Sequence, residues 1–108
     1  MICRMWKGFT TPANAPAYER YLREELFPRL QATIADQGYL GFHILRREVG
    51  AGAEVEFITM VWFTSLEAIK SFSGEGFERA VLTDKAKSLV AHWEEFATHH
   101  ELVDSSLR

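Results

Sequence analysis

Four histidines are the residues best suited to proton chemistry in this chain of 108 residues. His43 and His92 stand alone, whereas His99 and His100 are adjacent near the end of the chain. A neutral imidazole in an enclosed space can accept a proton near pH 7, so each is a candidate general base. A histidine without a visible partner is also commonly structural or exposed to solvent. On a strand, His99 and His100 would point to opposite faces, and the sequence does not decide which one faces an enclosed space.

Aromatic residues and two basic residues of the first strand form the second candidate group. Arg4 and Lys7 fall on opposite series of the first predicted strand, where one could stabilise an anion in a cavity or remain an exposed charge at the sheet edge. The aromatic residues could form core, as they usually do, or a flat apolar pocket for an aromatic substrate. They are Trp6, Trp62 and Trp93, with Phe9, Phe42, Phe57, Phe63 and Phe96.

Several kinds of site have no basis in the sequence. The run His99-His100-Glu101 is not a metal motif, because adjacent strand residues diverge, and Cys3 is the only cysteine. Gly50-Ala51-Gly52 lacks the strand-turn-helix context of a phosphate-binding loop, and no GxSxG motif is present. We therefore predict no metal site and no cofactor.

The composition limits the partners. The net charge is −3, with 12 basic and 15 acidic residues scattered along the chain, which argues against binding to nucleic acid or to an anionic membrane surface. No apolar run approaches the roughly 20 residues of a membrane span, and the first residues do not resemble a signal peptide. A single cysteine fits a reducing compartment, so we expect a cytoplasmic protein whose partner is a small molecule or a second copy of the chain.

The periodicity predicts the elements that must position these residues. Strands are expected at 2–9, 40–49, 55–63 and 93–103, with a long helix from a cap at Asn14 to a stop at Gly38 and a bend near Phe27 caused by Pro28. A second helix should begin at a capping box formed by Thr64 and Glu67, followed by helical pieces at 77–82 and 84–91 after the break at 73–76. This order predicts an α+β, ferredoxin-like βαββαβ protomer with a four-stranded antiparallel sheet, in one domain over residues 1–104 with a polar tail at 105–108.

The strand at 55–63 is apolar on both of its faces. Its odd positions include Val55, Phe57 and Val61, and its even positions include Met60 and Trp62. In the predicted topology both helices cover the same face of the sheet, so the second apolar series has no cover within the chain. A bare apolar sheet face of that size normally marks an interface. We therefore predict a homodimer in which two protomers pack sheet to sheet.

Two phrases of the sequence resemble a known family. The phrase "ITMVWFTSLEAIKSFSG", the ending "WEEFATHHELV" and the order of elements are similar to the antibiotic biosynthesis monooxygenases of the dimeric α/β-barrel superfamily, from Ile2 to about Val103. The resemblance implies a dimeric α/β barrel and cofactor-independent oxidation by O₂ of a small phenolic, quinol or anthrone-like aromatic substrate. The candidate residues for this chemistry are His99 as the base, with Trp6, Trp62, His43 and Arg4 binding the substrate.

A related branch of the family cleaves haem, and the chain departs from it. That branch uses an Asn on the first strand and a Trp and a His after the third strand, where this sequence has Lys7, Phe72 and about Val81. These departures speak against haem cleavage of that type, without excluding that haem binds. Two alternatives to the oxygenase stay open: a dimeric protein that binds a hydrophobic small molecule without turning it over, and an interaction protein whose sheet serves only for assembly.

Overall fold

The structure is a computed structural model that describes residues 1–74 and 76–107, so Glu75, within the predicted helix break, and Arg108, within the predicted tail, lie outside it. The elements are β1 (Ile2–Thr10), α1 (Ala15–Tyr21), the π-helical segment η1 (Leu22–Leu26), α2 (Phe27–Ile34), β2 (Tyr39–Val49), β3 (Glu54–Phe63), α3 (Leu66–Ser73), α4 (Asp84–Leu89), β4 (His92–Trp93) and β5 (Thr98–Glu101). This order confirms the predicted α+β, ferredoxin-like fold.

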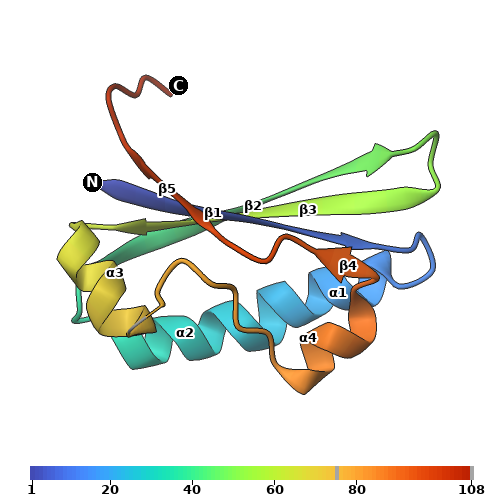
Figure 1. The fold of residues 1–108 in the computed structure, drawn as a ribbon, viewed down its shortest axis with the longest axis horizontal. Helices are drawn as coiled ribbons and strands as arrows, with labels where there is room; N and C mark the ends of the chain where they lie inside the picture. The colour runs from blue at the N-terminus through green and yellow to red at the C-terminus, as the bar shows by residue number, and fades with distance from the viewer. Residues whose placement is uncertain (75, 108) are drawn as a thin grey trace.

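The strands form one antiparallel sheet in the order β2-β3-β1-β4, and β5 also pairs with β1. β2 and β3 form an antiparallel hairpin, with a turn at residues 50–53 in which Ala51 has a φ of 56°. Figure 1 shows the helices together on one side of the sheet. The other side of the sheet is covered by no helix of the described residues, as the topology predicted.

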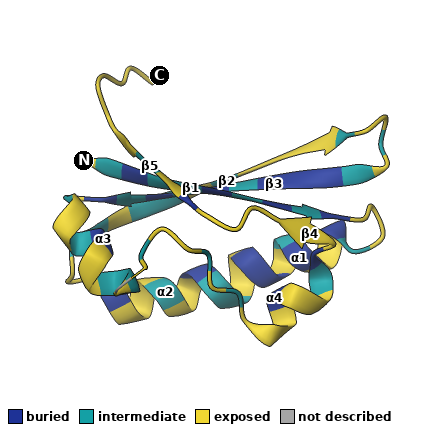
Figure 2. Ribbon diagram, in the orientation of Figure 1, coloured by how far each residue is buried: buried dark blue, intermediate teal, exposed yellow. Residues whose placement is uncertain are grey.

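Alternation along β3 determines what each side of the sheet carries. Phe57 and Phe63, at 0% exposure, belong to the series that faces the helices, and Phe57 meets the ring of Tyr18 edge to face at 5.1 Å. Met60 and Trp62 belong to the other series and are only half-buried. Figure 2 shows the buried residues concentrated in the strands and on the sheet-facing sides of the helices. The core therefore lies between the sheet and the helices.

The first helical segment contains a π-helical turn where the sequence predicted a bend. In η1 the Phe27 N–H donates to the carbonyl of Leu22, five residues earlier. Pro28 follows directly and has no N–H to continue the α-helical pattern, which is the physical reason for an irregular turn here. The helix ends at Ile34, and Gly38 adopts a φ of 83° in the turn that leads to β2.

Three local predictions were wrong, and non-local hydrogen bonds explain two of them. The cap of α3 is Ser65, whose hydroxyl accepts from the Ala68 N–H, rather than Thr64. Residues 77–82 form no helix, because the Ala80 N–H donates to the Glu95 carbonyl and the Ala97 N–H donates to the Glu78 carbonyl. The same contacts divide the predicted last strand into β4 and β5.

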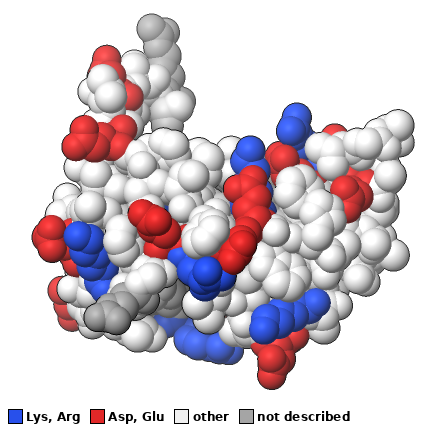
Figure 3. All heavy atoms as spheres, viewed as in Figure 1, with Lys and Arg blue, Asp and Glu red and all other residues white. Residues whose placement is uncertain are grey.

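The surface and the helix lengths agree with the composition. On the face drawn in Figure 3, basic and acidic side chains are interspersed. No helix among the described residues is long and apolar enough to cross a membrane.

Candidate functional site

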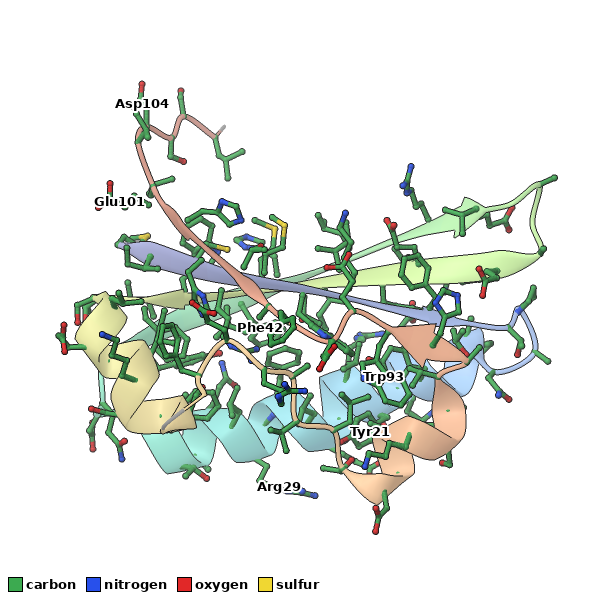
Figure 4. The ribbon with its side chains drawn as sticks, viewed as in Figure 1. Tyr21, Arg29, Phe42, Trp93, Glu101 and Asp104 are labelled. Atoms are coloured by element: carbon green, nitrogen blue, oxygen red, sulfur yellow. The ribbon has the colours of Figure 1, made fainter. Side chains whose placement is uncertain are left out.

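A cavity of about 380 Å³ lies between the sheet and the helices. Its walls come from β1, β3, the α1-η1-α2 segment, α3 and the stretch 79–86, and Figure 4 shows Tyr21 and Phe42 in the layer between the sheet and the helices. The lining is mostly apolar or aromatic: Trp6, Tyr18, Tyr21, Leu22, Leu26, Phe27, Leu30, Val61, Phe72, Ala80, Val81, Leu82 and Ala86, with Arg4, Thr59, Ser73, Arg79 and Thr83 as the polar members. Apolar walls with few polar groups are typical of small-molecule sites.

Arg4 supplies a positive charge to this cavity. It lies on β1 in the series that faces the helices, and its Nε is buried with no hydrogen-bond partner among the described residues. Burial lowers the pKa of Arg4, but an arginine stays charged at any physiological pH. The other arginine in the lining, Arg79, forms an ion pair with Glu95 and lies over the ring of Phe96 at 5.0 Å.

His99 lies beside Arg4, because the two residues are direct partners in the pairing of β1 with β5. Paired residues of neighbouring strands extend from the same face of a sheet, so the imidazole is on the side of the cavity. Its ring packs against Phe77 with centroids 5.1 Å apart, and its Nε2 is buried without a partner among the described residues. Burial, and then the charge of Arg4, lower the pKa of His99, so the ring is neutral at pH 7 and able to accept a proton.

Trp6 forms one wall of the cavity, but its polar group is already occupied. The side chain is 8% exposed, and the indole N–H donates to the Glu94 carbonyl at 2.7 Å. Gly8 allows this position, because a Cβ there would lie 3.0 Å from the indole ring. Trp6 can therefore offer a substrate an aromatic surface but not a hydrogen-bond donor.

Trp62 and His43 lie on the opposite side of the sheet, away from the cavity. Both belong to the bare-face series, and the Trp62 indole N–H donates to Nδ1 of His43 at 3.0 Å. The structure therefore places Arg4, Trp6 and His99 on the cavity side of the sheet, with His99 next to Arg4, and places Trp62 and His43 on the other side.

The two remaining histidines also lie outside the cavity. His100 is exposed on the bare-face series and its Nε2 is 2.8 Å from the Thr98 hydroxyl. His92 stacks on Phe9 with ring centroids 4.6 Å apart and lies 2.7 Å from a carboxylate oxygen of Glu54. Of the four histidines, His99 alone lies on the cavity side of the sheet, where it is half-buried beside Arg4 and is not part of the cavity lining itself.

Sequence reasoning missed most of the cavity lining. Leu22, Leu26 and Leu30 recur every four residues, the spacing of a helix face that packs into a core, and they face inward but border an open volume. Tyr21 and Thr83 were not singled out, although their hydroxyl oxygens lie 2.7 Å apart and join the helix to the start of α4. The available signal was Pro28 within an amphipathic helix, because the irregular turn beside it brings both Leu26 and Phe27 to the cavity.

No group of three or more His, Cys, Asp or Glu residues in the described parts of the chain is arranged to hold a metal ion. At the haem-branch positions, Phe72 lines the cavity and Val81, 91% exposed, lies at its edge, while Lys7 belongs to the opposite face of the sheet. None of these side chains supplies the Asn, Trp and His of that branch.

Comparison with known proteins supports the fold. The chain resembles a solved structure from Bacillus cereus assigned to the antibiotic biosynthesis monooxygenases, with a TM-score of 0.64 and 14% sequence identity over 100% of this chain and 96% of the other. No family model and no curated protein matches the sequence. The chain thus has the fold of these monooxygenases, in agreement with the resemblance of its sequence.

Proposed function

We propose that this protein is a cofactor-independent monooxygenase that oxidises a small phenolic, quinol or anthrone-like substrate with O₂ in the cavity between sheet and helices. The observation that carries the proposal is the pair formed by Arg4, a half-buried cation in the cavity lining, and His99, a half-buried neutral base next to it. Nε of Arg4 and Nε2 of His99 are buried without hydrogen-bond partners among the described residues. The monooxygenase fold supports it.

The chemistry needs only what these residues supply. His99 takes a proton from the substrate hydroxyl, and the positive charge of Arg4 favours the anion that results. An electron-rich anion of this kind can itself transfer an electron to O₂, after which the two radicals combine at carbon. Apolar walls such as Trp6 and Phe72 exclude water from that step.

The overall reaction balances without another reductant. A hydroquinone ring C–H and O₂ give a hydroxyquinone and water, so that one oxygen atom enters the ring and the other leaves as water. The substrate supplies all four electrons. The proton that His99 accepted returns in the water that is released.

We also propose a homodimer formed through the bare face of the sheet, in a reducing cytoplasm. Support comes from the half-buried apolar side chains Met5, Ile58, Met60 and Trp62 on a side that no described helix covers. On this model Trp62 and His43 belong to the interface rather than to the substrate site.

The test is oxygen uptake by metal-free protein with a panel of anthrones, hydroquinones and naphthols. We expect uptake that falls by roughly 10²–10⁴-fold in His99→Gln, the contribution typical of a general base. His100→Gln is the matched control and should keep the rate, because His100 lies on the other face. If no compound is consumed but some stabilise the fold against heat, the protein is a ligand-binding module instead.

A further inference from the structure

Arg4 carries a half-buried charge that no described acidic residue balances. Other arginines of the chain, Arg23, Arg46, Arg47 and Arg79, each form an ion pair with a glutamate. Arg4 forms none of the ion pairs found in residues 1–74 and 76–107, and its Nε has no hydrogen-bond partner there. Burying an unpaired charge is costly, and such groups are normally paired. A guanidinium left in this state within a cavity is suited to receive an anion from outside the chain.

The remaining lining limits what that anion can be attached to. The walls around Arg4 are apolar and aromatic, with Trp6 and Phe72 among them. A volume of about 380 Å³ lies near the lower end of the roughly 300–1,000 Å³ of small-molecule pockets. A body of one or two fused rings suits this space better than a larger polycycle.

We propose, building on the oxygenase function above, that the substrate is an aromatic carboxylate: a one- or two-ring hydroquinone or phenol whose carboxylate binds the Arg4 guanidinium while its ring occupies the apolar cavity. A guanidinium can bind a carboxylate through two parallel hydrogen bonds, which fixes orientation as well as position. Because His99 is the cross-strand partner of Arg4, a carboxylate held by Arg4 places the ring next to the base.

The same contact couples binding to proton transfer. The charged or titratable groups that act on His99 are Arg4 on β1, Glu78 on the segment before α4 and His100 on β5. Arg4 and His100 lower the pKa of His99, and Glu78 raises it. A bound carboxylate neutralises the charge of Arg4, so it raises the pKa of His99 and makes the imidazole a stronger base when the substrate is present. The carboxylate itself is unchanged in the reaction.

The first experiment compares 2-naphthoate with 2-naphthamide by titration calorimetry. The two ligands have nearly the same shape, and neither is a hydroquinone, so charge is tested without turnover. We expect the wild-type protein to bind the carboxylate roughly ten- to a hundredfold more tightly, the usual contribution of a hydrogen bond to a charged group. Equal affinities in the wild type would overturn the proposal without any variant.

Substitutions of Arg4 test whether this residue causes the preference for the carboxylate ligand. Arg4→Gln should remove it, and Arg4→Lys should keep part of it, because a lysine retains the charge but not the planar pair of donors. Arg29→Gln is the matched control, since Arg29 points away from the sheet and the cavity (Figure 4). The imidazole signals of His99 should titrate at higher pH with 2-naphthoate than with 2-naphthamide. A preference that persists in Arg4→Gln would contradict the assignment.

Oxygen uptake separates this inference from the oxygenase proposal. With the uncatalysed rate subtracted, we compare 1,4-dihydroxy-2-naphthoate with 1,4-dihydroxynaphthalene. Faster uptake with the carboxylate, lost in Arg4→Gln, supports both. A charge preference in binding with no uptake from either compound overturns the oxygenase and leaves the anion site. Equal uptake from both, unaffected by Arg4→Gln, leaves the oxygenase and overturns the anion site.

Discussion

The two faces of the sheet use similar residues for different purposes. On the helix-covered face, Phe57, Val61 and Phe63 are at most 6% exposed. The same face borders a cavity lined by Val61 and by Arg4, whose Nε has no hydrogen-bond partner among the described residues. On the bare face, Met60 and Trp62 are half-buried, and the indole N–H of Trp62 is already bonded to His43. The tryptophan-histidine pair is thus hydrogen-bonded on the face proposed for assembly, whereas Arg4 Nε and His99 Nε2 have no partner among the described residues on the face proposed for chemistry.

This difference shows that residues of the same type can have different roles on the two faces. Both faces carry a tryptophan and a histidine, but of Trp6 and Trp62 only Trp6 lines the cavity. A buried polar atom without a partner costs free energy, so its persistence on one face is informative there. The following changes test whether the two faces are as distinct as the structure indicates.

The largest expected effect is the loss of stability from a substitution on the helix-covered face. Phe57→Ala removes a fully buried ring that packs against Tyr18, and it should lower the free energy of unfolding by about 3–5 kcal/mol. Urea unfolding followed by tryptophan fluorescence measures this. A loss below about 1 kcal/mol would show that this face is not the packed core.

A charged substitution on the bare face should weaken association of the proposed dimer. Met60→Asp places a carboxylate in the middle of the proposed interface, where burying it without a partner should cost at least about 3 kcal/mol, or roughly a hundredfold in the dimer Kd. Sedimentation velocity over a range of concentrations reads this out. Leu66→Asp, on the exposed part of α3, is the control and should leave the dimer intact. A protein that is monomeric before any substitution would refute the dimer.

The proton chemistry should depend on pH through His99. Its pKa is lowered by burial and by Arg4, and only the neutral ring acts as a base, so activity should persist at pH 7 and fall only as pH drops below the ordinary value of 6.5. Arg4→Gln removes one of the causes and should move this loss to higher pH. The pH dependence of kcat/KM, with His100→Gln as a control, provides the measurement. A loss of activity that begins above pH 7 would contradict a neutral His99.

The smallest expected effect is a change in the pH dependence of stability caused by replacing Glu56 on the bare face. Glu56 is 3% exposed, and its hydrogen bonds to Arg47 lower its pKa below the ordinary 4.5 although burial opposes the shift. Its contribution to stability is therefore present above pH 4.5 and lost as pH falls through the lowered pKa. Glu56→Gln should flatten this part of the melting-temperature profile between pH 3 and 6. Glu101→Gln, at an exposed position, should not change the profile.

Much of the fold was predictable from the sequence. The alternation in β1, the apolar run in β3 and the four-residue spacing of Tyr18, Leu22 and Leu26 indicated the element types, because each is typical of one kind of element. The bare face followed from the element order, since right-handed crossovers place the helices together. The predicted helix at 77–82 failed because its backbone groups bond to residues 95–97, which are distant in sequence.

The candidate site was predictable only in its residue types. The sequence by itself determined that His99 and His100 point to opposite faces, because alternation is local. Which of them lies on the cavity side depends on the pairing of β5 with β1, which brings His99 to Arg4 across most of the length of the chain. The separation of Trp62 and His43 from Trp6 is likewise a matter of strand register. Register and cavity arise from contacts between distant segments, so the tertiary structure alone decided them.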